Sequence, residues 1–114
     1  MEKKLYNLDT LSEIVDHDEK ELKEMLQMFI ELSPSIQEEM IEAHEEYNYK
    51  KLSNLAHKLK SNLRLLEIDE LVDVARSIEK KSKDATDRQG IDELMDKINK
   101  TLPDIVSQIK TDEL

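Results

Sequence analysis

Apolar residues recur at intervals of three and four along most of the chain, and this spacing most constrains its fold. Such spacing places the apolar side chains on one face of a helix. Four long segments show it, at Leu22, Met25, Leu26, Phe29, Ser33, Ile36, Met40, Ala43 and Tyr47; Leu52, Leu55, Ala56, Leu59, Leu63 and Leu66; Leu71, Val74, Ala75 and Ile78; and Ile91, Leu94, Met95, Ile98, Leu102, Ile105 and Ile109. Because each helix must bury its apolar face, we predict an all-α fold, an antiparallel up-down-up-down four-helix bundle. At 114 residues the chain is expected to form a single domain, 1–114.

A short helix is predicted before the bundle. Thr10 and Glu13 have the spacing of a capping box, in which each side chain satisfies a backbone N–H group near the helix start. We therefore expect a helix from about residue 10 to 16. Its apolar face consists of Leu8, Leu11, Ile14 and Val15.

The first long helix is predicted over residues 19–47. Asp18 and Glu21 mark its start. Pro34 lies inside the pattern and removes a backbone hydrogen bond, so we expect a kink there. Ser33 could instead cap a new helix, but the apolar spacing continues across the proline and favours one kinked helix.

The remaining boundaries follow from charged residues and proline. Acidic residues are common in the first turn of a helix, and Asp69 and Glu70 mark such a start. They begin the third long helix, which directly follows the segment that contains His57. The polar run 80–90 is predicted to be a connection. Pro103 is expected to bend the last helix.

Composition excludes several classes of function. The formal net charge is −10, which disfavours nucleic acid and anionic membranes as partners. The longest apolar runs are far shorter than the ~20 residues needed to cross a bilayer. The chain has no Cys, so it has no disulfide, thiol nucleophile or thiolate metal ligand. We expect a cytoplasmic, free-standing protein.

His57 stands out by its helical phase. It lies well over ~100° from the centre of the apolar face of its own helix, so we predict that it faces solvent. Its neighbours one turn away are Ser53, Asn54, Lys60, Ser61 and Arg64. Between residues 48 and 66 there is no acidic residue, whereas the same stretch carries Lys50, Lys51, Lys58, Lys60 and Arg64.

An exposed imidazole among cations suits one chemistry well. Neutral imidazole is a nucleophile, and a phosphoryl group that it accepts carries about two negative charges. Nearby Lys and Arg would stabilise that charge. Ser61 is small enough to let a second protein approach. The alternative interpretation is an ordinary solvated helix face, whose basic residues only complement helix dipoles or neighbouring acidic helices.

The other two histidines are assigned structural roles. His44 lies at the edge of its apolar stripe and is predicted to be half-buried, and His17 is expected to cap a helix or to be solvated. Di-iron bundles require Glu-x-x-His pairs, and neither these histidines nor His57 has a Glu three residues before it. We therefore expect no metal site.

These residues resemble the histidine-containing phosphotransfer (HPt) domain family. The resemblance covers roughly residues 18–109, and its signature consists of Ala56, His57, Lys58, Leu59, Lys60 and Ser61, then Leu63, Leu66, Leu71, Ala75 and Glu79. The family often has Gly where this chain has Ser61. It also often has Gly in the following turn, where this chain has Leu66-Glu67-Ile68, so a different helix ending or a longer helix is expected.

The resemblance implies a specific role. HPt domains are four-helix bundles whose exposed histidine carries phosphoryl groups between aspartates of receiver domains, in response regulators and hybrid sensor histidine kinases. His57 matches the phospho-acceptor, Lys60 matches the lysine that neutralises the phosphoryl group, and Lys58 matches a commonly basic position. Partner docking is expected at Lys58, Ser61, Arg64, Asn54 and Ser53.

The same resemblance limits the cofactors. Mg²⁺ would be held by the receiver's carboxylates. Because the chain has no Gly-rich phosphate loop, it should act as a stoichiometric carrier in two-component signalling rather than as an autonomous kinase, with no cofactor of its own. The alternative is a non-catalytic adaptor that binds an acidic partner through the basic face around Lys60 and Arg64.

Overall fold

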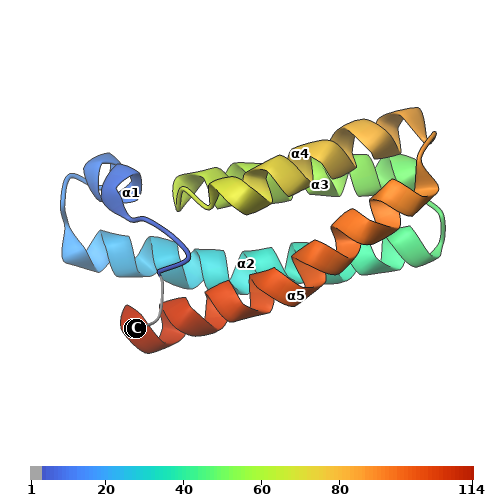
Figure 1. Ribbon diagram of the computed structural model, residues 1–114. Helices are drawn as coiled ribbons and strands as arrows, with labels where there is room; N and C mark the ends of the chain where they lie inside the picture. Colours follow the sequence, from blue (N-terminus) through green and yellow to red (C-terminus); the bar gives the residue numbers. More distant parts are fainter. Residues whose placement is uncertain (1–3) are drawn as a thin grey trace.

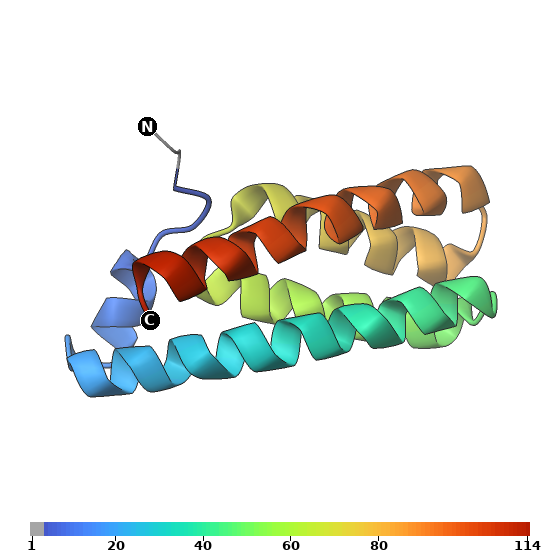
Figure 2. The same ribbon diagram turned by 90° about the horizontal axis from the view of Figure 1, so that it is seen from below.

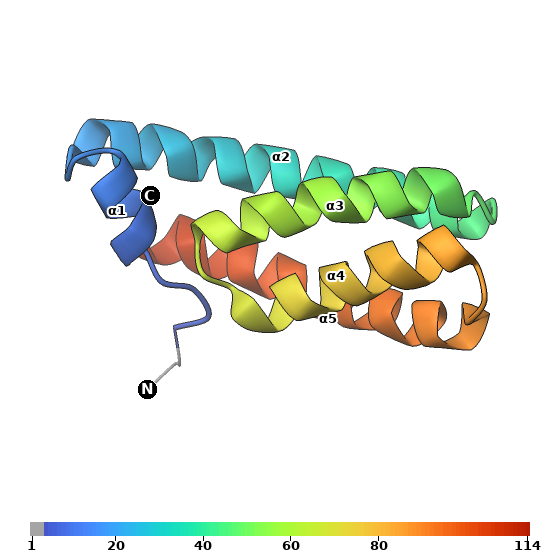
Figure 3. The same ribbon diagram turned by 90° about the horizontal axis from the view of Figure 1, so that it is seen from above.

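The computed structural model describes residues 4–114, and this part of the chain contains five α-helices and no strand. They are α1 (Asp9–Ile14), α2 (Glu19–Glu45), α3 (Tyr49–Leu65), α4 (Asp69–Asp84) and α5 (Arg88–Asp112). The four long helices pack side by side, and the chain passes back and forth along them, with α1 at one end (Figure 1). Helices α2 and α4 each contact both α3 and α5 (Figures 2 and 3). The all-α prediction is confirmed.

Three long helices begin at side-chain caps. Asp18 accepts hydrogen bonds from two backbone N–H groups in the first turn of α2. Asn48 and Asp87 each accept one at the starts of α3 and α5. These bonds satisfy N–H groups that have no partner within the helix. The start of α2 at Glu19 is as predicted.

The capping box predicted at Thr10 and Glu13 is wrong. α1 begins one residue earlier, at Asp9, and no side chain caps it from the N-cap position at Leu8. Instead, the backbone N–H of Asp9 donates to Asn7 Oδ1 at 2.8 Å. This local bond turns the chain into the helix early and places Thr10 inside the first turn.

Non-glycine residues adopt the left-handed backbone in every link between helices. Their φ angles are 55° and 60° at Asp16 and His17, 57° at Tyr47, 52° at Glu67 and 54° at Ala85. Such a residue ends a helix, usually at a cost of roughly 1–2 kcal/mol when it is not glycine. The first two helices are therefore shorter than the predicted 10–16 and 19–47.

The turn after α3 shows how this helix ends without glycine. The backbone N–H of Ile68 donates to the carbonyl of Leu63 at 3.1 Å, and that of Glu67 donates to the carbonyl of Arg64 at 3.1 Å. Leu66 and Ile68 are buried on either side of the left-handed Glu67. The burial of Leu66 and Ile68 stabilises a turn that glycine would adopt at lower conformational cost. Helix α3 is therefore not extended.

The polar connection predicted over residues 80–90 is wrong. Helix α4 continues to Asp84, and only residues 85–87 link it to α5. Ser82 is buried one turn after the buried Ile78, so the inner face of the helix continues past Lys80. The run of polar residues is the exposed face of a helix rather than a loop.

Both prolines lie inside continuous helices. Helix α2 passes through Pro34, so the separate helix capped at Ser33 does not form, and Ser33 is buried. Helix α5 passes through Pro103 in the same way.

The core consists of the inner faces of all four long helices. Every apolar position predicted on α3 and α4 is buried, as are Leu66 and most of those predicted on α2 and α5. Tyr47 and Ile14 are exceptions, with exposed fractions of 67% and 60%, because each lies at or beyond the end of its helix. No helix within residues 4–114 has a stretch apolar and long enough to span a bilayer.

The segment before α1 is fixed to the bundle. Tyr6 is buried, and its hydroxyl donates to Glu113 Oε2 at 2.6 Å. Burial and the Glu113 carboxylate raise the pKa of Tyr6 well above its ordinary 10.0, so the phenol keeps the proton that it donates. The backbone N–H of Asn7 donates to the carbonyl of Leu66 at 2.8 Å. These bonds connect the N-terminal segment to both α5 and the α3–α4 turn.

Candidate functional site

His57 lies in the middle of α3 with its side chain 61% exposed. The residues that position it face the opposite way, since Ala56 and Leu59 are completely buried in the core. The predicted helical phase is therefore confirmed. A mid-helix position with a packed opposite face keeps the backbone of His57 rigid while its ring remains accessible.

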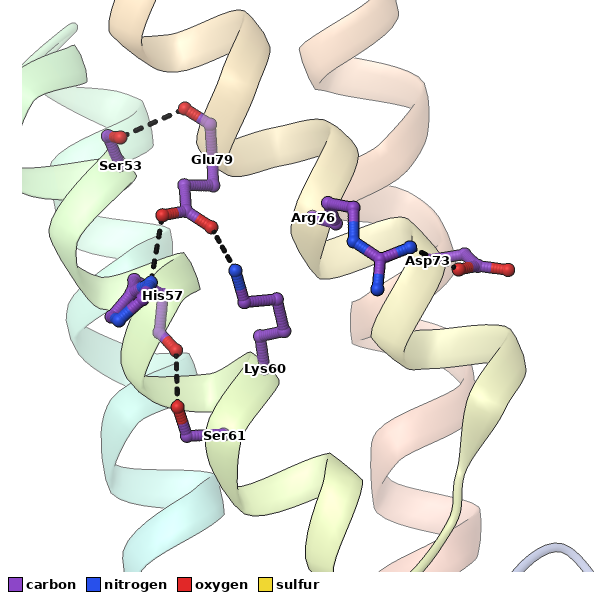
Figure 4. A network of polar contacts seen from close by, with 7 residues as sticks. All are labelled: Ser53, His57, Lys60, Ser61, Asp73, Arg76 and Glu79. Atoms are coloured by element: carbon purple, nitrogen blue, oxygen red, sulfur yellow. Dashed lines mark hydrogen bonds and ion pairs between the residues drawn. The ribbon is translucent and has the colours of Figure 1, made fainter.

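Glu79 on α4 joins His57 to Lys60 (Figure 4). Its Oε2 atom lies 2.9 Å from Nδ1 of His57, and its Oε1 atom accepts a hydrogen bond from Nζ of Lys60 at 2.7 Å. His57 and Lys60 are one turn apart on α3, so a single carboxylate from α4 reaches both. The result is a three-residue polar network across the α3–α4 interface.

The carboxylate of Glu79 is stabilised in its ionised form. The hydrogen bond from Lys60 lowers its pKa below the ordinary 4.5, partial burial opposes this, and the hydrogen bond to His57 lowers the pKa further. An ionised carboxylate only accepts hydrogen bonds, so Nδ1 of His57 carries the proton of their shared bond. In the neutral ring, Nε2 then keeps its lone pair, which is the condition for a nucleophile.

Lys60 differs in its surroundings from a free surface cation. Its side chain is only 11% exposed, and its ammonium group is held by Glu79. The positive charge therefore first neutralises the carboxylate beside the imidazole. A short, partly buried pair of this kind is stronger than an ion pair in open solvent.

Ser53 does not belong to the solvent face where it was predicted. It is buried, and its hydroxyl donates to the backbone carbonyl of Glu79 at 2.9 Å. Its small size lets α4 approach α3 closely at this height. Ser53 thus holds in place the backbone that carries Glu79, and partner docking at Ser53 is a prediction that the structure contradicts.

The other predicted docking residues are accessible. Lys58, Arg64 and Asn54 are exposed on α3. Ser61 is exposed as well, and its hydroxyl donates to the carbonyl of His57 at 3.2 Å. Arg64 is not among the residues that the hydrogen bonds of Glu79 join. The arginine drawn in Figure 4 is Arg76 on α4, which pairs with Asp73 at 3.0 Å and points away from the imidazole.

The remaining histidines have the structural surroundings predicted for them. Nε2 of His44 lies 2.6 Å from Oδ1 of Asp92, which links α2 to α5, and its side chain is 24% exposed. His17 is exposed, with Nδ1 3.2 Å from the hydroxyl of Ser12. Across residues 4–114, no three His, Asp or Glu side chains are grouped closely enough to hold a metal ion.

The sequence interpretation did not assign Glu79 to the site. It named the residue only within the family signature. The available signal was its position one residue after the inward-facing Ile78, beside an α3 segment without any acid. A carboxylate at the edge of that helix face was the natural partner for the unpaired cations of α3.

Together, the fold and this site define a helical bundle that presents one histidine, oriented by a carboxylate from the neighbouring helix. A family model, described as the Hpt domain, matches residues 24–112. The match covers most of the chain, so the chain belongs to the Hpt domain family. Members of this family take part in histidine phosphotransfer in phosphorelays and interact there with receiver domains. No curated protein and no solved structure matches the chain.

Proposed function

We propose that His57 accepts a phosphoryl group from the phosphoaspartate of one receiver domain and passes it to an aspartate of another. The observation that carries this proposal is the arrangement of the ring. His57 is 61% exposed, and its Nδ1 atom is 2.9 Å from Glu79 Oε2, so Nε2 is the nitrogen left free to react. The receivers would belong to response regulators or hybrid sensor kinases.

The proposed step moves one phosphoryl group without an oxidant or a net change in protons. The Nε2 lone pair attacks phosphorus, a P–N bond forms, and the P–O bond to the receiver's aspartate breaks, which leaves that aspartate as a carboxylate. The proton stays on Nδ1, so the phosphorylated ring is positively charged next to Glu79. The carboxylate can stabilise this charge as it develops. Transfer to the second receiver is the reverse step with a new aspartate.

Lys60 is proposed to neutralise the negative charge of Glu79, which lies beside the ring that the phosphoryl group approaches. Alone, the carboxylate of Glu79 would repel an arriving anion. With the ammonium of Lys60 at 2.7 Å, the pair has no net charge. The exposed Lys58 and Arg64 then supply the positive potential that attracts the anionic partner surface.

We further propose that the chain works without a cofactor of its own. Mg²⁺ would be held by the carboxylates of the receiver, and the chain would act as a stoichiometric carrier. Its contribution to the reaction is to present Nε2, to hold the Nδ1 proton and to position the receiver.

A second candidate function is a non-catalytic adaptor. The observation in its favour is that α3 carries five cations and no acid, with Lys58 and Arg64 exposed. An acidic partner could bind this face without any transfer to His57. In that case, reversing the charges of Lys60 and Arg64 would abolish binding, and His57→Ala would bind normally.

The test is phosphoryl transfer to the purified protein. Receiver domains encoded in the same genome are phosphorylated with radiolabelled acetyl phosphate, freed of donor and mixed with wild type or with His57→Gln. We expect acid-labile label on wild type with at least one receiver and none on the variant. His44→Gln is the matched control and should accept label normally. Equal label on His57→Gln would exclude His57 as the acceptor.

A further inference from the structure

Ser53, His57 and Lys60 of α3 each bond to Glu79 on α4. His57 and Lys60 meet the carboxylate, with Nδ1 at 2.9 Å from Oε2 and Nζ at 2.7 Å from Oε1. Ser53 meets the backbone of the same residue, because its hydroxyl donates to the Glu79 carbonyl at 2.9 Å (Figure 4). The three residues have i, i+4, i+7 spacing, which places them on one stripe of α3 that faces α4.

The hydroxyl of Ser53 bonds across to the neighbouring helix rather than within its own. A serine inside a helix commonly donates to the carbonyl four residues earlier, and Ser61 does so, to His57 at 3.2 Å. The Glu79 carbonyl lies inside α4, where it accepts the bond of its own helix, and its second lone pair is free for Ser53. The Ser53 bond therefore acts between the two helices and is not needed to complete α4.

The buried face of α4 fixes its rotation more firmly than its position along α3. Ala75, Ile78 and Ser82 are all buried, so this face points into the core, and Glu79 lies at its edge. Apolar burial is non-directional, whereas a hydrogen bond has a defined length and direction. The bond from Ser53 thus fixes how far along α3 the backbone of Glu79 lies.

The two bonds of the Glu79 carboxylate leave little room for displacement. Both have lengths typical of charge-assisted hydrogen bonds. One carboxylate must reach two donors that are a turn apart, so a shift of roughly 1 Å away from either donor would break one bond. A misplacement of about this size in a reacting site can lower a rate by up to about 100-fold.

We propose that Ser53 is a positioning residue for the reaction of His57. Its bond to the Glu79 carbonyl holds α4 where the carboxylate reaches both Nδ1 of His57 and Nζ of Lys60. Ser53 thereby keeps the ring proton on Nδ1 and the lone pair on Nε2, although its own bond is to the backbone. The effect on the ring follows from this geometry, and the effect on transfer rests on the proposed function.

The burial of Ser53 distinguishes this role from contact with a partner. The residue is 9% exposed, so a bound receiver has little access to it. Loss of a contact with the receiver would raise the half-saturating receiver concentration. Loss of a positioning bond lowers the maximal transfer rate instead.

The test compares two matched pairs of variants. Ser53→Ala removes the hydroxyl, and Ser82→Ala makes the same change at a buried serine of α4 whose hydroxyl has no hydrogen-bond partner within residues 4–114. Ser53→Thr and Ser53→Val have the same shape and differ in the hydroxyl. NMR of the ring nitrogens reports the tautomer of His57. Transfer rate is measured against the concentration of the phosphorylated receiver domain that labels wild type fastest, at a temperature where thermal melts show every variant folded.

We expect Ser53→Ala to shift the neutral ring from protonation at Nδ1 toward Nε2. Its maximal transfer rate should fall about tenfold, and its half-saturating receiver concentration should stay within about twofold of wild type. Ser82→Ala should match wild type in both the tautomer and the rate. Ser53→Thr should keep more of the rate than Ser53→Val.

A double variant tests whether Ser53 acts through Glu79. Ser53→Ala combined with Glu79→Ala should transfer no more slowly than Glu79→Ala alone, because both substitutions remove the same influence on the ring. A further fall in rate in the double variant would show that Ser53 acts by another route and would overturn the proposal.

Two further results would also contradict it. Ser53→Ala that is less stable but has the tautomer and maximal rate of wild type would give Ser53 a structural role only. A raised half-saturating concentration at an unchanged maximal rate would assign it to docking. If no receiver labels wild type, the proposed function fails, and the tautomer in Ser53→Ala alone decides the positioning role: a shift supports it, and an unchanged ring overturns it.

Discussion

Glu79 on α4 accepts the Nδ1 proton of His57 on α3 at 2.9 Å, although 22 residues separate them in the sequence. This contact turns an exposed histidine into an oriented one. It fixes which ring nitrogen has the lone pair, and its strength depends on Lys60, which keeps the carboxylate ionised.

The contact between His57 and Glu79 makes its most specific prediction about the tautomer of the His57 ring. In wild type at neutral pH, we expect NMR of the ring nitrogens to show a neutral His57 protonated mainly at Nδ1. Glu79→Ala removes the acceptor, so the neutral ring should shift toward protonation at Nε2, the form that prevails in water. Glu93→Ala, on the exposed face of α5, is the control and should leave the ring unchanged. An unchanged His57 spectrum in Glu79→Ala would contradict the assignment.

The lowered pKa of Glu79 predicts a pH-dependent contribution to stability. Because the pKa is lower in the folded protein than the ordinary 4.5, the ionised carboxylate stabilises the fold at higher pH, and this contribution is lost as the pH falls below 4.5. Glu79→Gln should therefore be less stable than wild type near neutral pH, and the difference should shrink in acid. Urea melts at about pH 7 and about pH 3.5 measure it. A difference that is the same at both values would show that the ionisation of Glu79 makes no contribution.

The packed core beneath His57 predicts that a substitution at Leu59 strongly lowers the stability of the protein. This residue is completely buried beneath the site. Leu59→Ala should lower the free energy of unfolding by roughly 2–5 kcal/mol, because it removes buried methyl groups and leaves a cavity. Leu32→Ala, on the exposed side of α2, makes the same chemical change and should cost far less. Urea melts compare the two, and equal losses would contradict the helical phase of α3.

Ser53 and Ser61 predict opposite outcomes from the same substitution. Ser53→Ala removes a buried hydrogen bond to the Glu79 carbonyl, so we expect a loss of about 1 kcal/mol in the free energy of unfolding. Ser61→Ala removes only an exposed bond to the carbonyl of its own helix and should be near neutral. Chemical denaturation measures both. If Ser61→Ala destabilises the protein more than Ser53→Ala, the role assigned to Ser53 is wrong.

The helices and their buried faces were predictable because spacing in the sequence reports directly on the face of a helix. The exposure of His57 followed from the same rule. The helix ends were less predictable, since Asn7, Glu67 and Ala85 act through local backbone geometry that no apolar pattern records. The polar face at the end of α4 has the composition of a loop, and only the buried Ser82 shows otherwise.

The candidate site was predictable in part for a related reason. His57, Lys58 and Ser61 lie on one helix, so their relation follows from α3 alone. The role of Glu79, the burial of Ser53 and the pairing of Lys60 all depend on how closely α4 packs against α3. Contacts between two helices require their relative rotation and height, which the pattern within each helix does not define.

Phosphorus NMR of the phosphorylated protein tests the central claim most directly. After transfer from a phosphorylated receiver domain, the spectrum distinguishes a phosphoryl group on Nε2 from one on Nδ1. The geometry of His57 and Glu79 predicts a single signal from Nε2-phosphohistidine, absent in His57→Gln. A signal from Nδ1-phosphohistidine, or a phosphoryl group that persists in His57→Gln, would contradict it.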